Sequence, residues 1–210
     1  MSEPGVRAVL ATRNAHKAQE IEALLRSAEP VDRLGLRLLP LDHPDLRATP
    51  DVVESGTTFA ANALLKARAA AATTGLPALA DDSGLAVDVL GGAPGIFSAR
   101  WCGRHGDDRA NLELLLAQLA DVPDDERGAA FVCAAALVLP GGAEEVRTGR
   151  LDGSLAREAL GEGGFGYDPV FRPVGGRRTF GQMSAVEKGA ISHRARAFGA
   201  LAQELPDLLR

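Results

Sequence analysis

Two adjacent carboxylates, Asp81 and Asp82, could do chemistry because they directly follow a short apolar run, residues 76–80, that predicts a strand. Carboxylates at the end of a buried strand are costly unless a cation or hydrogen-bond donors compensate them. Hard divalent cations prefer oxygen ligands, so the pair indicates a Mg²⁺ site. The alternative is that Asp81, Asp82 and Ser83 form a turn that caps the next segment. This stretch alone does not decide between the two.

A second polar group, residues 12–17, has the sequence Thr-Arg-Asn-Ala-His-Lys and separates a β-rich apolar run from apolar residues at helical spacing. A strand–turn–helix of this kind directs backbone N–H groups and the positive helix end toward a bound phosphate. Lys17 lies early enough in the predicted helix to reach the same anion. The segment lacks the glycine spacing of a Walker A loop. A capped helix with a solvated lysine is the competing interpretation.

A third group begins with Glu54-Ser55-Gly56 and continues into a helix predicted over residues 59–73. Asn62 and Lys66 are four residues apart on that helix, so they share one face. An exposed polar face would explain the pair equally well without any function.

Residues 161–171 combine four glycines with Phe165, Tyr167 and Asp168. Such a segment is typical of backbone that passes close to a flat ligand stacked on an aromatic ring. A glycine-rich hairpin with its aromatic rings tucked underneath is the alternative.

Three basic residues, Lys188, His193 and Arg194, gather near the start of the predicted C-terminal helix, for which Ser192 is the expected N-cap. Cations at that position oppose the helix dipole, so they are placed for an anion or for acceptor atoms on a base. Without the other groups, a solvated basic patch would be the simpler interpretation.

The elements that must position these residues alternate between strands and helices along the chain. We expect strands over residues 6–11, 34–41, 76–80, 129–139 and 144–151, with a turn at residues 81–84 followed by a further apolar stretch at 85–90, and a surface connection at 42–51. No repeat or low-complexity linker interrupts them. The pattern therefore predicts one α/β domain over residues 1–210, with two lobes as an option.

Composition narrows the class of protein. The chain has 210 residues, 46% of them hydrophobic, and a formal charge of −5, which argues against a surface that coats nucleic acid. No apolar run is long enough to span a bilayer, and the first residues lack a signal-peptide core. Cys102 and Cys133 match no metal or redox spacing. These features predict a reduced, cytoplasmic protein with no membrane or nucleic-acid partner.

Together the polar groups follow the order of six motifs found in the inosine triphosphate pyrophosphatase family, which the chain resembles over nearly its whole length. In chain order they are Thr12-Arg13-Asn14…Lys17, Glu54-Ser55-Gly56…Phe59…Asn62…Lys66-Ala67, Ala80-Asp81-Asp82-Ser83-Gly84-Leu85, Gly91-Gly92-Ala93-Pro94-Gly95…Ser98-Ala99-Arg100, Gly164-Phe165-Gly166-Tyr167-Asp168-Pro169 and Glu187-Lys188…Ser192-His193-Arg194. Each motif alone is weak, whereas six in order are highly specific.

The resemblance implies an α/β fold in which an elongated mixed β-sheet is flanked by helices, with two lobes and an active-site cleft between them. It implies Mg²⁺-dependent hydrolysis of noncanonical purine nucleoside triphosphates (dITP/ITP, XTP) to the monophosphate and pyrophosphate, which cleanses the nucleotide pool. It also implies a homodimer.

The resemblance further implies a role for each site residue. Asp82 would be the general base, and Mg²⁺ would be held by Glu54 and Asp82, with Asp81 as a further candidate ligand. The triphosphate would be bound by Thr12, Arg13, Asn14, Ala15, His16, Lys17, Lys66 and Ser83. The nucleoside would be bound by Phe165, Gly166, Tyr167, Asp168, Lys188, His193 and Arg194.

Base selection must come from polar groups, because ring stacking is indifferent to base identity. Donors such as Arg194, His193 or a backbone N–H can meet the 6-oxo group of hypoxanthine or xanthine, and the 6-amino group of adenine would leave them unpaired.

One departure from the family pattern is Val53, where a second acidic residue is common. Two alternatives stay open: a related α/β pyrophosphatase for modified pyrimidine nucleotides, and a nucleotide-binding module without turnover.

Overall fold

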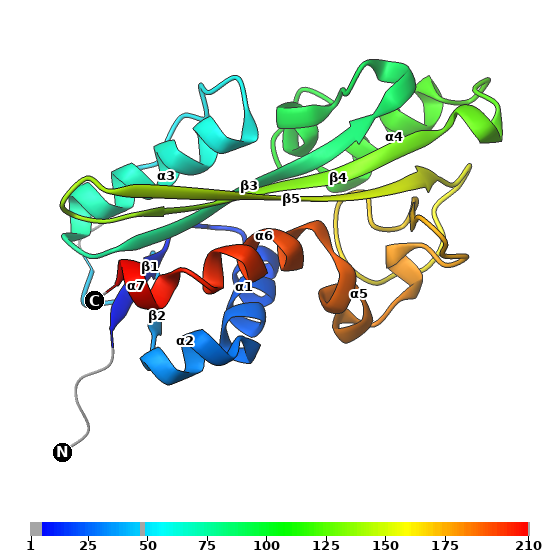
Figure 1. Ribbon diagram of the computed structural model, residues 1–210. Helices are drawn as coiled ribbons and strands as arrows, with labels where there is room; N and C mark the ends of the chain where they lie inside the picture. The colour runs from blue at the N-terminus through cyan, green and yellow to red at the C-terminus, as the bar shows by residue number, and fades with distance from the viewer. Residues whose placement is uncertain (1–5, 47–48, 210) are drawn as a thin grey trace. The chain divides into compact units, whose positions relative to one another are not determined.

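The computed structural model describes residues 6–46 and 49–209. Within them six strands alternate with seven α-helices (Figure 1): β1 (Arg7–Leu10), α1 (Ala15–Ser27), α2 (Glu29–Leu34), β2 (Arg37–Pro40), α3 (Phe59–Thr74), β3 (Ala78–Val87), α4 (Asp108–Gln118), β4 (Gly128–Val138), β5 (Glu144–Leu155), β6 (Phe171–Pro173), α5 (Ala185–Ile191), α6 (His193–Ala202) and α7 (Leu205–Leu208). Short 3₁₀ helices, η1 to η4, cover Asp88–Leu90, Gly95–Arg100, Asp124–Glu126 and Phe180–Gln182. Among the described helices, none has the length and apolarity required to cross a membrane.

The six strands form one mixed sheet in the order β2-β1-β3-β4-β5-β6. Strand β1 runs parallel to β2 and to β3, whereas β5 and β6 are antiparallel. Parallel neighbours need helical crossovers, and α1 with α2 and then α3 supply them between β1, β2 and β3. The predicted α/β class, with a mixed sheet flanked by helices, is confirmed.

The chain divides into two compact units. Unit 1 comprises Met1–Asp82, Cys133–Gly149 and Arg194–Arg210, and unit 2 comprises Ser83–Val132 and Arg150–His193. Each unit has its own apolar core. The single domain over residues 1–210 stays a prediction.

In unit 1 the side chains of β1, β3 and β4 alternate between two cores, one on each face of the strands. On one face Leu10 and Leu79 pack with α1, α6 and α7, which lie together below the strands in Figure 1. On the other face Val9, Ala78 and Ala80 pack against the alanines of α3, which lies above the strands. The small alanine side chains let α3 sit close to the strands.

The extent of β3 contradicts the turn that was predicted at residues 81–84. Residues 81–84 do not form a turn, because β3 continues without a break from Ala78 to Val87. Its period of two places Asp81 on the same face as Leu79 and Asp82 on the same face as Ala80. Both carboxylates are therefore buried inside a strand, where compensating groups must surround them.

Unit 2 is built around aromatic packing. The Phe131 ring lies 4.6 Å from the Phe171 ring and is stacked on the imidazole of His193 at 4.7 Å. Phe180 completes the cluster at 5.3 Å from Phe171. Leucines from β3, α4 and β5 fill the rest of this core.

The other differences from the sequence-based expectations are two elements that were not expected, α2 and β6, and several shifted element ends. The predicted C-terminal helix is two helices, α6 and α7, and β2 is shorter than residues 34–41. Within the predicted connection at 42–51, residues 47 and 48 lie outside the described part.

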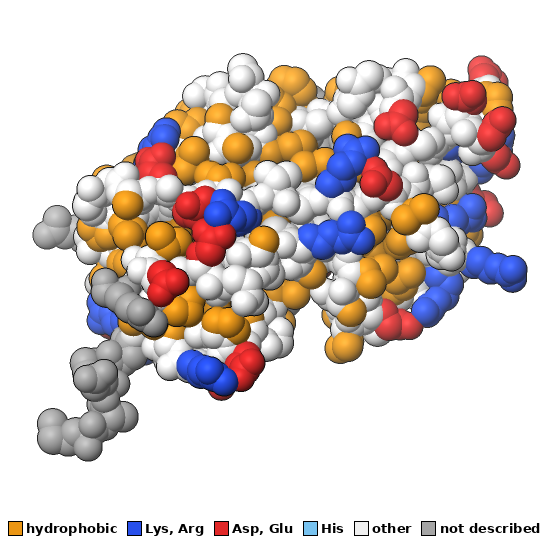
Figure 2. All heavy atoms as spheres, viewed as in Figure 1, with side chains coloured by type: hydrophobic (Ala, Val, Ile, Leu, Met, Phe, Trp, Pro, Cys, Tyr) orange, Lys and Arg blue, Asp and Glu red, His pale blue; other side chains and the backbone are white. Residues whose placement is uncertain are grey.

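On the face shown in Figure 2, basic side chains lie singly or beside acidic ones, as expected for a chain with a net charge of −5.

The alanine face of α3 generates a stability prediction. Ala70 is fully buried against the strands, so Ala70→Leu should overpack this face and lower the free energy of unfolding by about 1–3 kcal/mol. Ala72 is exposed on the same helix, and Ala72→Leu should change it by less than about 0.5 kcal/mol. Urea unfolding of both variants measures the difference. Equal losses would show that α3 does not pack as described.

Candidate active site

The register between β1 and β3 brings the polar segments of unit 1 together. Leu10 is paired with Leu79, and the Ala11 N–H donates to the Leu79 carbonyl at 2.7 Å. Strand β1 ends there while β3 continues, so Asp81 and Asp82 lie beside the segment that leads into α1. The carboxyl ends of parallel strands are the usual ligand-binding edge of an α/β sheet.

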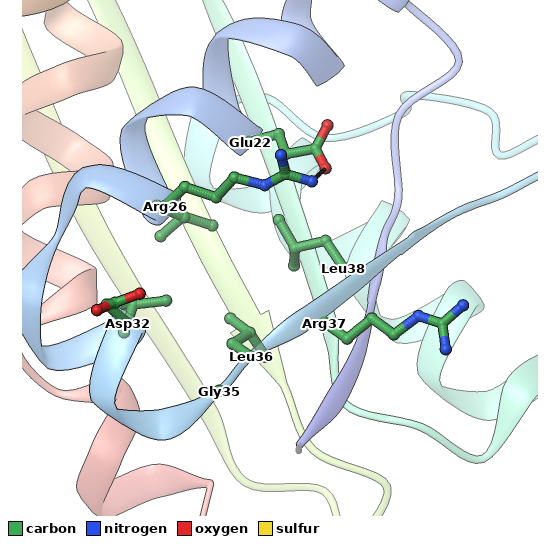
Figure 3. Close-up of a pocket in the computed structure, with 9 residues that line it drawn as sticks. Glu22, Arg26, Asp32, Gly35, Leu36, Arg37 and Leu38 are labelled. Atoms are coloured by element: carbon green, nitrogen blue, oxygen red, sulfur yellow. Dashed lines mark hydrogen bonds and ion pairs between the residues drawn. The ribbon is translucent and has the colours of Figure 1, made fainter. Parts of the chain in front are cut away.

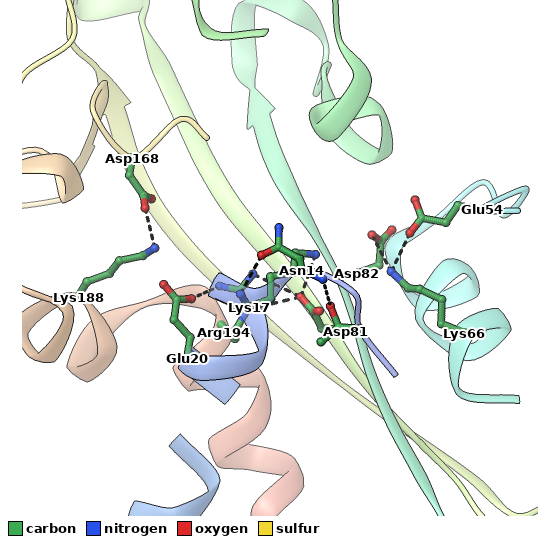
Figure 4. Close-up of polar contacts among 11 residues, drawn as sticks. Asn14, Lys17, Glu20, Glu54, Lys66, Asp81, Asp82, Asp168, Lys188 and Arg194 are labelled. Atoms are coloured by element: carbon green, nitrogen blue, oxygen red, sulfur yellow. Dashed lines mark hydrogen bonds and ion pairs between the residues drawn. The ribbon is translucent and has the colours of Figure 1, made fainter. Parts of the chain in front are cut away.

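Asp82 faces α3 (Figure 4). Its Oδ2 accepts a hydrogen bond from Asn62 Nδ2 at 3.1 Å, and its Oδ1 lies 3.5 Å from the Lys66 ammonium. The same ammonium lies 2.8 Å from Glu54 Oε1, so one lysine bridges two carboxylates. The amide oxygen of Asn62 accepts the Gly56 N–H at 2.8 Å, which ties the segment containing Glu54 to α3.

Burial and charge set the protonation of this group. Burial raises the pKa of the Asp82 carboxyl above its ordinary value, although Lys66 and, less strongly, Lys17 act in the opposite direction. Burial alone would lower the pKa of the Lys66 ammonium, but the charges of Asp82, Asp81 and Glu54 outweigh it, so that pKa is raised. Lys66 is therefore a permanent cation beside a carboxylate that accepts a proton more readily than an exposed one.

Asp81 faces α1 and α6 instead (Figure 4). Its Oδ2 lies 3.3 Å from the Lys17 ammonium and accepts from Arg194 Nη2 at 3.3 Å and Nε at 3.4 Å. Arg194 also donates through Nη1 to Glu20, one turn after Lys17 on α1. Burial would lower the pKa of the Arg194 guanidinium, but Asp81 and Glu20 outweigh it, so that pKa is raised. The side chains of both Asp81 and Arg194 are almost completely buried.

This arrangement separates the three predicted metal ligands. Glu54 and Asp82 share a cation, whereas Asp81 points to the opposite face of β3 and pairs with two other cations. Across the described residues, no group of three His, Cys, Asp or Glu side chains could hold a metal ion. Two carboxylates fit Mg²⁺, which usually binds through one or two carboxylates together with substrate phosphates.

The turn before α1 is held by its own side chains. Asn14 is the N-cap, and its Oδ1 accepts the Lys17 N–H at 3.0 Å, while Thr12 Oγ1 accepts the Asn14 N–H at 3.2 Å. Arg13 is directed away from Lys17, to the Thr49 carbonyl at 2.7 Å and the Asp51 carboxylate at 2.6 Å. Ala15 and His16 form the exposed first turn of α1. The start of α1 is thus open to an anion.

In unit 2 the predicted nucleoside-binding residues meet at Asp168. Its Oδ2 accepts the Phe165 N–H at 2.9 Å and lies 2.7 Å from the Lys188 ammonium, and both side chains of this ion pair are buried. The ammonium lies 4.6 Å from the centre of the Phe165 ring, within cation–π range. Gly164 has φ +75°, and a Cβ there would lie 2.0 Å from Asp168 Oδ2, so only glycine fits.

Two other predicted residues of unit 2 have side chains in the core. Tyr167 is 4% exposed, and its hydroxyl donates to the Ser98 carbonyl at 2.9 Å. His193 is stacked on Phe131 and is 3% exposed. Any contact that Tyr167 makes with a ligand would therefore have to come from its backbone. Ser83 follows Asp82 in β3 and is partly buried.

Sequence reasoning missed three residues that hold the site. Asn62 had been noted as sharing a face with Lys66 and as part of one motif, but it had been given no role in the site. Gly56 opposite it has no room for a Cβ, which would lie 2.6 Å from Asn62 Oδ1. Glu20 carried a signal, because it lies three residues after Lys17 on one helix face. Asp108, the first residue of α4, accepts the Gly166 N–H at 3.0 Å, and it belonged to none of the polar groups singled out in the sequence.

A separate pocket of about 280 Å³ lies at the corner formed by α1, α2 and β2 in unit 1. Leucines line its floor, and Glu22, Arg26, Asp32 and Arg37 lie around it (Figure 3). It contains none of the predicted site residues.

The comparisons with known proteins agree with one another. Residues 8–204 match the model of the Ham1 family. The chain is 58% identical to a dITP/XTP pyrophosphatase of Streptomyces coelicolor over 97% of this chain and 98% of that protein. The Streptomyces avermitilis dITP/XTP pyrophosphatase is 59% identical over the same shares.

Solved structures give the same result. A HAM1 protein from Coxiella burnetii superposes with a TM-score of 0.83 at 39% identity, over 96% of this chain and 99% of that chain. A nucleoside-triphosphatase / dITP/XTP pyrophosphatase from Mycobacterium abscessus gives a TM-score of 0.74 at 51% identity, over 96% and 100%. Because sequence and structure agree over almost the whole length, the chain belongs to the Ham1 family.

Proposed function

We propose that the protein is a dITP/XTP pyrophosphatase that converts noncanonical purine nucleoside triphosphates to the monophosphate and pyrophosphate. The single observation that carries this proposal is the pair of buried carboxylates on β3, surrounded by cations from α1, α3 and α6 at the carboxyl end of β1. Paired carboxylates beside a phosphate site are difficult to explain in a module that only binds nucleotide, unless a metal ion is also bound. The names of relatives more than 50% identical support the same activity.

The chemistry assigned to this chain is attack by water on the α-phosphorus. Asp82 takes a proton from the water as its oxygen bonds to phosphorus, and the bond from the α-phosphorus to the bridging oxygen of pyrophosphate breaks. Lys17 and Lys66 neutralise the charge that develops on the phosphate oxygens. Asn62 fixes the orientation of the Asp82 carboxylate through its hydrogen bond to Oδ2.

Mg²⁺ belongs to the same proposal, with Glu54 and Asp82 as its protein ligands. When bound, the ion would neutralise phosphate charge and polarise the bond that breaks. Lys66 lies between these two carboxylates, so it keeps their repulsion low before substrate arrives.

The nucleoside is assigned to Phe165, Asp168 and Lys188 of unit 2. The Phe165 ring offers a face for stacking with a base. The buried Lys188 would donate a hydrogen bond to the 6-oxo group of the base, and the 6-amino group of adenine could not accept that bond. A homodimer and a cytoplasmic location complete the proposal; the first is supported by the family resemblance and the second by a cysteine pattern without disulfide or metal spacing.

A substrate panel tests the proposed function first. With Mg²⁺, purified protein should convert dITP and XTP to monophosphate and pyrophosphate, with kcat/KM at least about 100-fold above that for dATP. Chromatography of the nucleotides and a phosphate assay with and without added pyrophosphatase identify the products. Release of orthophosphate alone, equal rates on dATP, or preference for a modified pyrimidine triphosphate would contradict the proposal.

Asp82→Asn tests the general base. The amide cannot accept a proton from water, so kcat should fall about 10²–10⁴-fold while binding of a nonhydrolysable dITP analogue is retained. Asp32→Asn, at an exposed position of α2, is the matched control and should keep full activity. Calorimetric binding and steady-state kinetics separate the two effects, and an Asp82→Asn enzyme with normal turnover would exclude the assigned role.

Lys66→Met tests whether Lys66 lowers the pKa of the Asp82 carboxyl. Activity requires ionised Asp82, so kcat/KM falls as the pH drops through the pKa of that carboxyl. Lys66 is the largest influence that lowers this pKa, and its removal should move the acid limb of the profile to higher pH. Lys17→Met should move the limb in the same direction by a smaller amount. An acid limb that stays in place in Lys66→Met would mean that another group titrates.

A further inference from the structure

The backbone around Phe165, whose ring is assigned to the base, is held by two carboxylates of unit 2. The Phe165 N–H donates to Asp168 Oδ2 at 2.9 Å. The next N–H along the chain, that of Gly166, donates to Asp108 Oδ2 at 3.0 Å. These two N–H groups belong to the peptide planes on either side of the Phe165 Cα, so both flanking planes are hydrogen-bonded to a carboxylate.

The orientation of these planes decides where the Phe165 side chain points, because each residue has only two soft backbone dihedral angles. Asp168 acts from within the loop, and its buried carboxylate also pairs with the Lys188 ammonium at 2.7 Å (Figure 4). Asp108 acts from outside the loop, because it lies 58 residues before Gly166 in the chain. It therefore fixes the loop relative to a separate element, the start of α4.

The start of α4 is a firm anchor that does not depend on Asp108. Asp107 is the N-cap of the helix through its own side chain. Asn111 is buried, and its amide oxygen accepts the Cys102 N–H at 2.8 Å. One turn further along, Leu115 is fully buried in the core of unit 2. The exposed Asp108 carboxylate thus projects from a helix that is already held in place.

A second contact supports the loop from the same part of unit 2. The Tyr167 hydroxyl donates to the Ser98 carbonyl at 2.9 Å. Ser98 belongs to η2, which contacts α4, and its hydroxyl oxygen accepts the Leu85 N–H of β3 at 2.9 Å. The motif at residues 91–100, to which the proposed function gave no task, therefore joins the loop to the sheet.

We propose that Asp108 is a positioning residue that sets the Phe165 ring for the base through the Gly166 N–H. This inference rests on the proposed function. The base is separated by the sugar from the α-phosphorus, where bonds change, so stacking is equally strong in the ground state and the transition state. Loss of such uniform binding raises KM and leaves kcat unchanged.

Asp108→Ala removes the acceptor of the Gly166 N–H. The KM for dITP should rise about fivefold, which is the worth of one typical hydrogen bond, and kcat should stay within about twofold of the parent value. Asp108→Asn keeps an acceptor oxygen at the same place, so its KM should return to within about twofold of the parent value. The calorimetric Kd for pyrophosphate, which has no base, should be the same in all three proteins. Hydrogen exchange of the Gly166 amide, followed by NMR, should be faster in Asp108→Ala than in the parent.

Asp107→Ala is the matched control, because it removes the neighbouring carboxylate and the N-cap bond to the Ala110 N–H but leaves Asp108 in place. It should lower the stability of the protein to urea and leave the KM for dITP unchanged. An equal rise in KM in Asp107→Ala would show that Asp108 acts by stabilising α4, and would overturn the proposal. A fall in kcat at unchanged KM in Asp108→Ala, or an Asp108→Asn enzyme as impaired as Asp108→Ala, would also overturn it.

Failure of the proposed function would be seen separately. A parent protein inactive on dITP would refute that function, whereas Gly166 exchange still tests the anchor. An exchange rate that is unchanged in Asp108→Ala would show that Asp108 does not hold the loop, and would refute the inference whatever the substrate.

Discussion

The alternation of side chains along β3 is the constraint on which the rest of unit 1 depends. A strand sends neighbouring residues to opposite faces, so Asp81 and Asp82 enter two separate cores. Each core must then supply its own cations, because a buried carboxylate without a partner would be severely destabilising. Helix α3 supplies Lys66 on one face, and α1 and α6 supply Lys17 and Arg194 on the other.

The two faces are not electrically independent. Lys17 lowers the pKa of Asp82 although it pairs with Asp81, and Asp81 raises the pKa of Lys66 although it faces the other way. Substitution on one face should therefore be felt on the other, and effects within this group should not add. The alanine-rich packing of α3 serves the same end, because close approach of the helix brings Lys66 and Asn62 to the strand.

Much of the fold could be predicted from the sequence, because the spacing of apolar residues distinguishes most of the strands and helices. Both β4 and α3 were expected within one or two residues of their observed ends. The segment at Asp81 was misread as a turn for a physical reason: Asp and Ser favour turns locally, and only tertiary contacts from distant helices make them tolerable inside a strand. The partners of Asp81 lie at residues 17 and 194, and no local pattern joins positions so far apart.

The site residues divide in the same way. Residue types and spacing drew attention to Lys17, Lys66 and Asp82, and the order of the six motifs gave them roles. Which cation pairs with which carboxylate depends on the alternation of side chains along β3 and on the positions of the helices. Asn62 shows the limit most clearly, because a buried amide that joins a backbone N–H to a carboxylate looks in the sequence like any polar residue on a helix. Tyr167 shows the opposite case: it lies in a motif that was predicted to bind the nucleoside, but its side chain is buried in the core.

The charges of the described cluster bear on why a metal would be needed at all. Four carboxylates, Glu20, Glu54, Asp81 and Asp82, face three cations, Lys17, Lys66 and Arg194, which leaves a net charge of −1. Such a cluster is stable in the free protein because nearly every charge is compensated, but it offers no excess of positive charge to a polyphosphate. A divalent cation entering with the substrate would reverse that sign without burying an uncompensated lysine beforehand. The acidic excess therefore supports the proposal that substrate binding and activity depend on Mg²⁺.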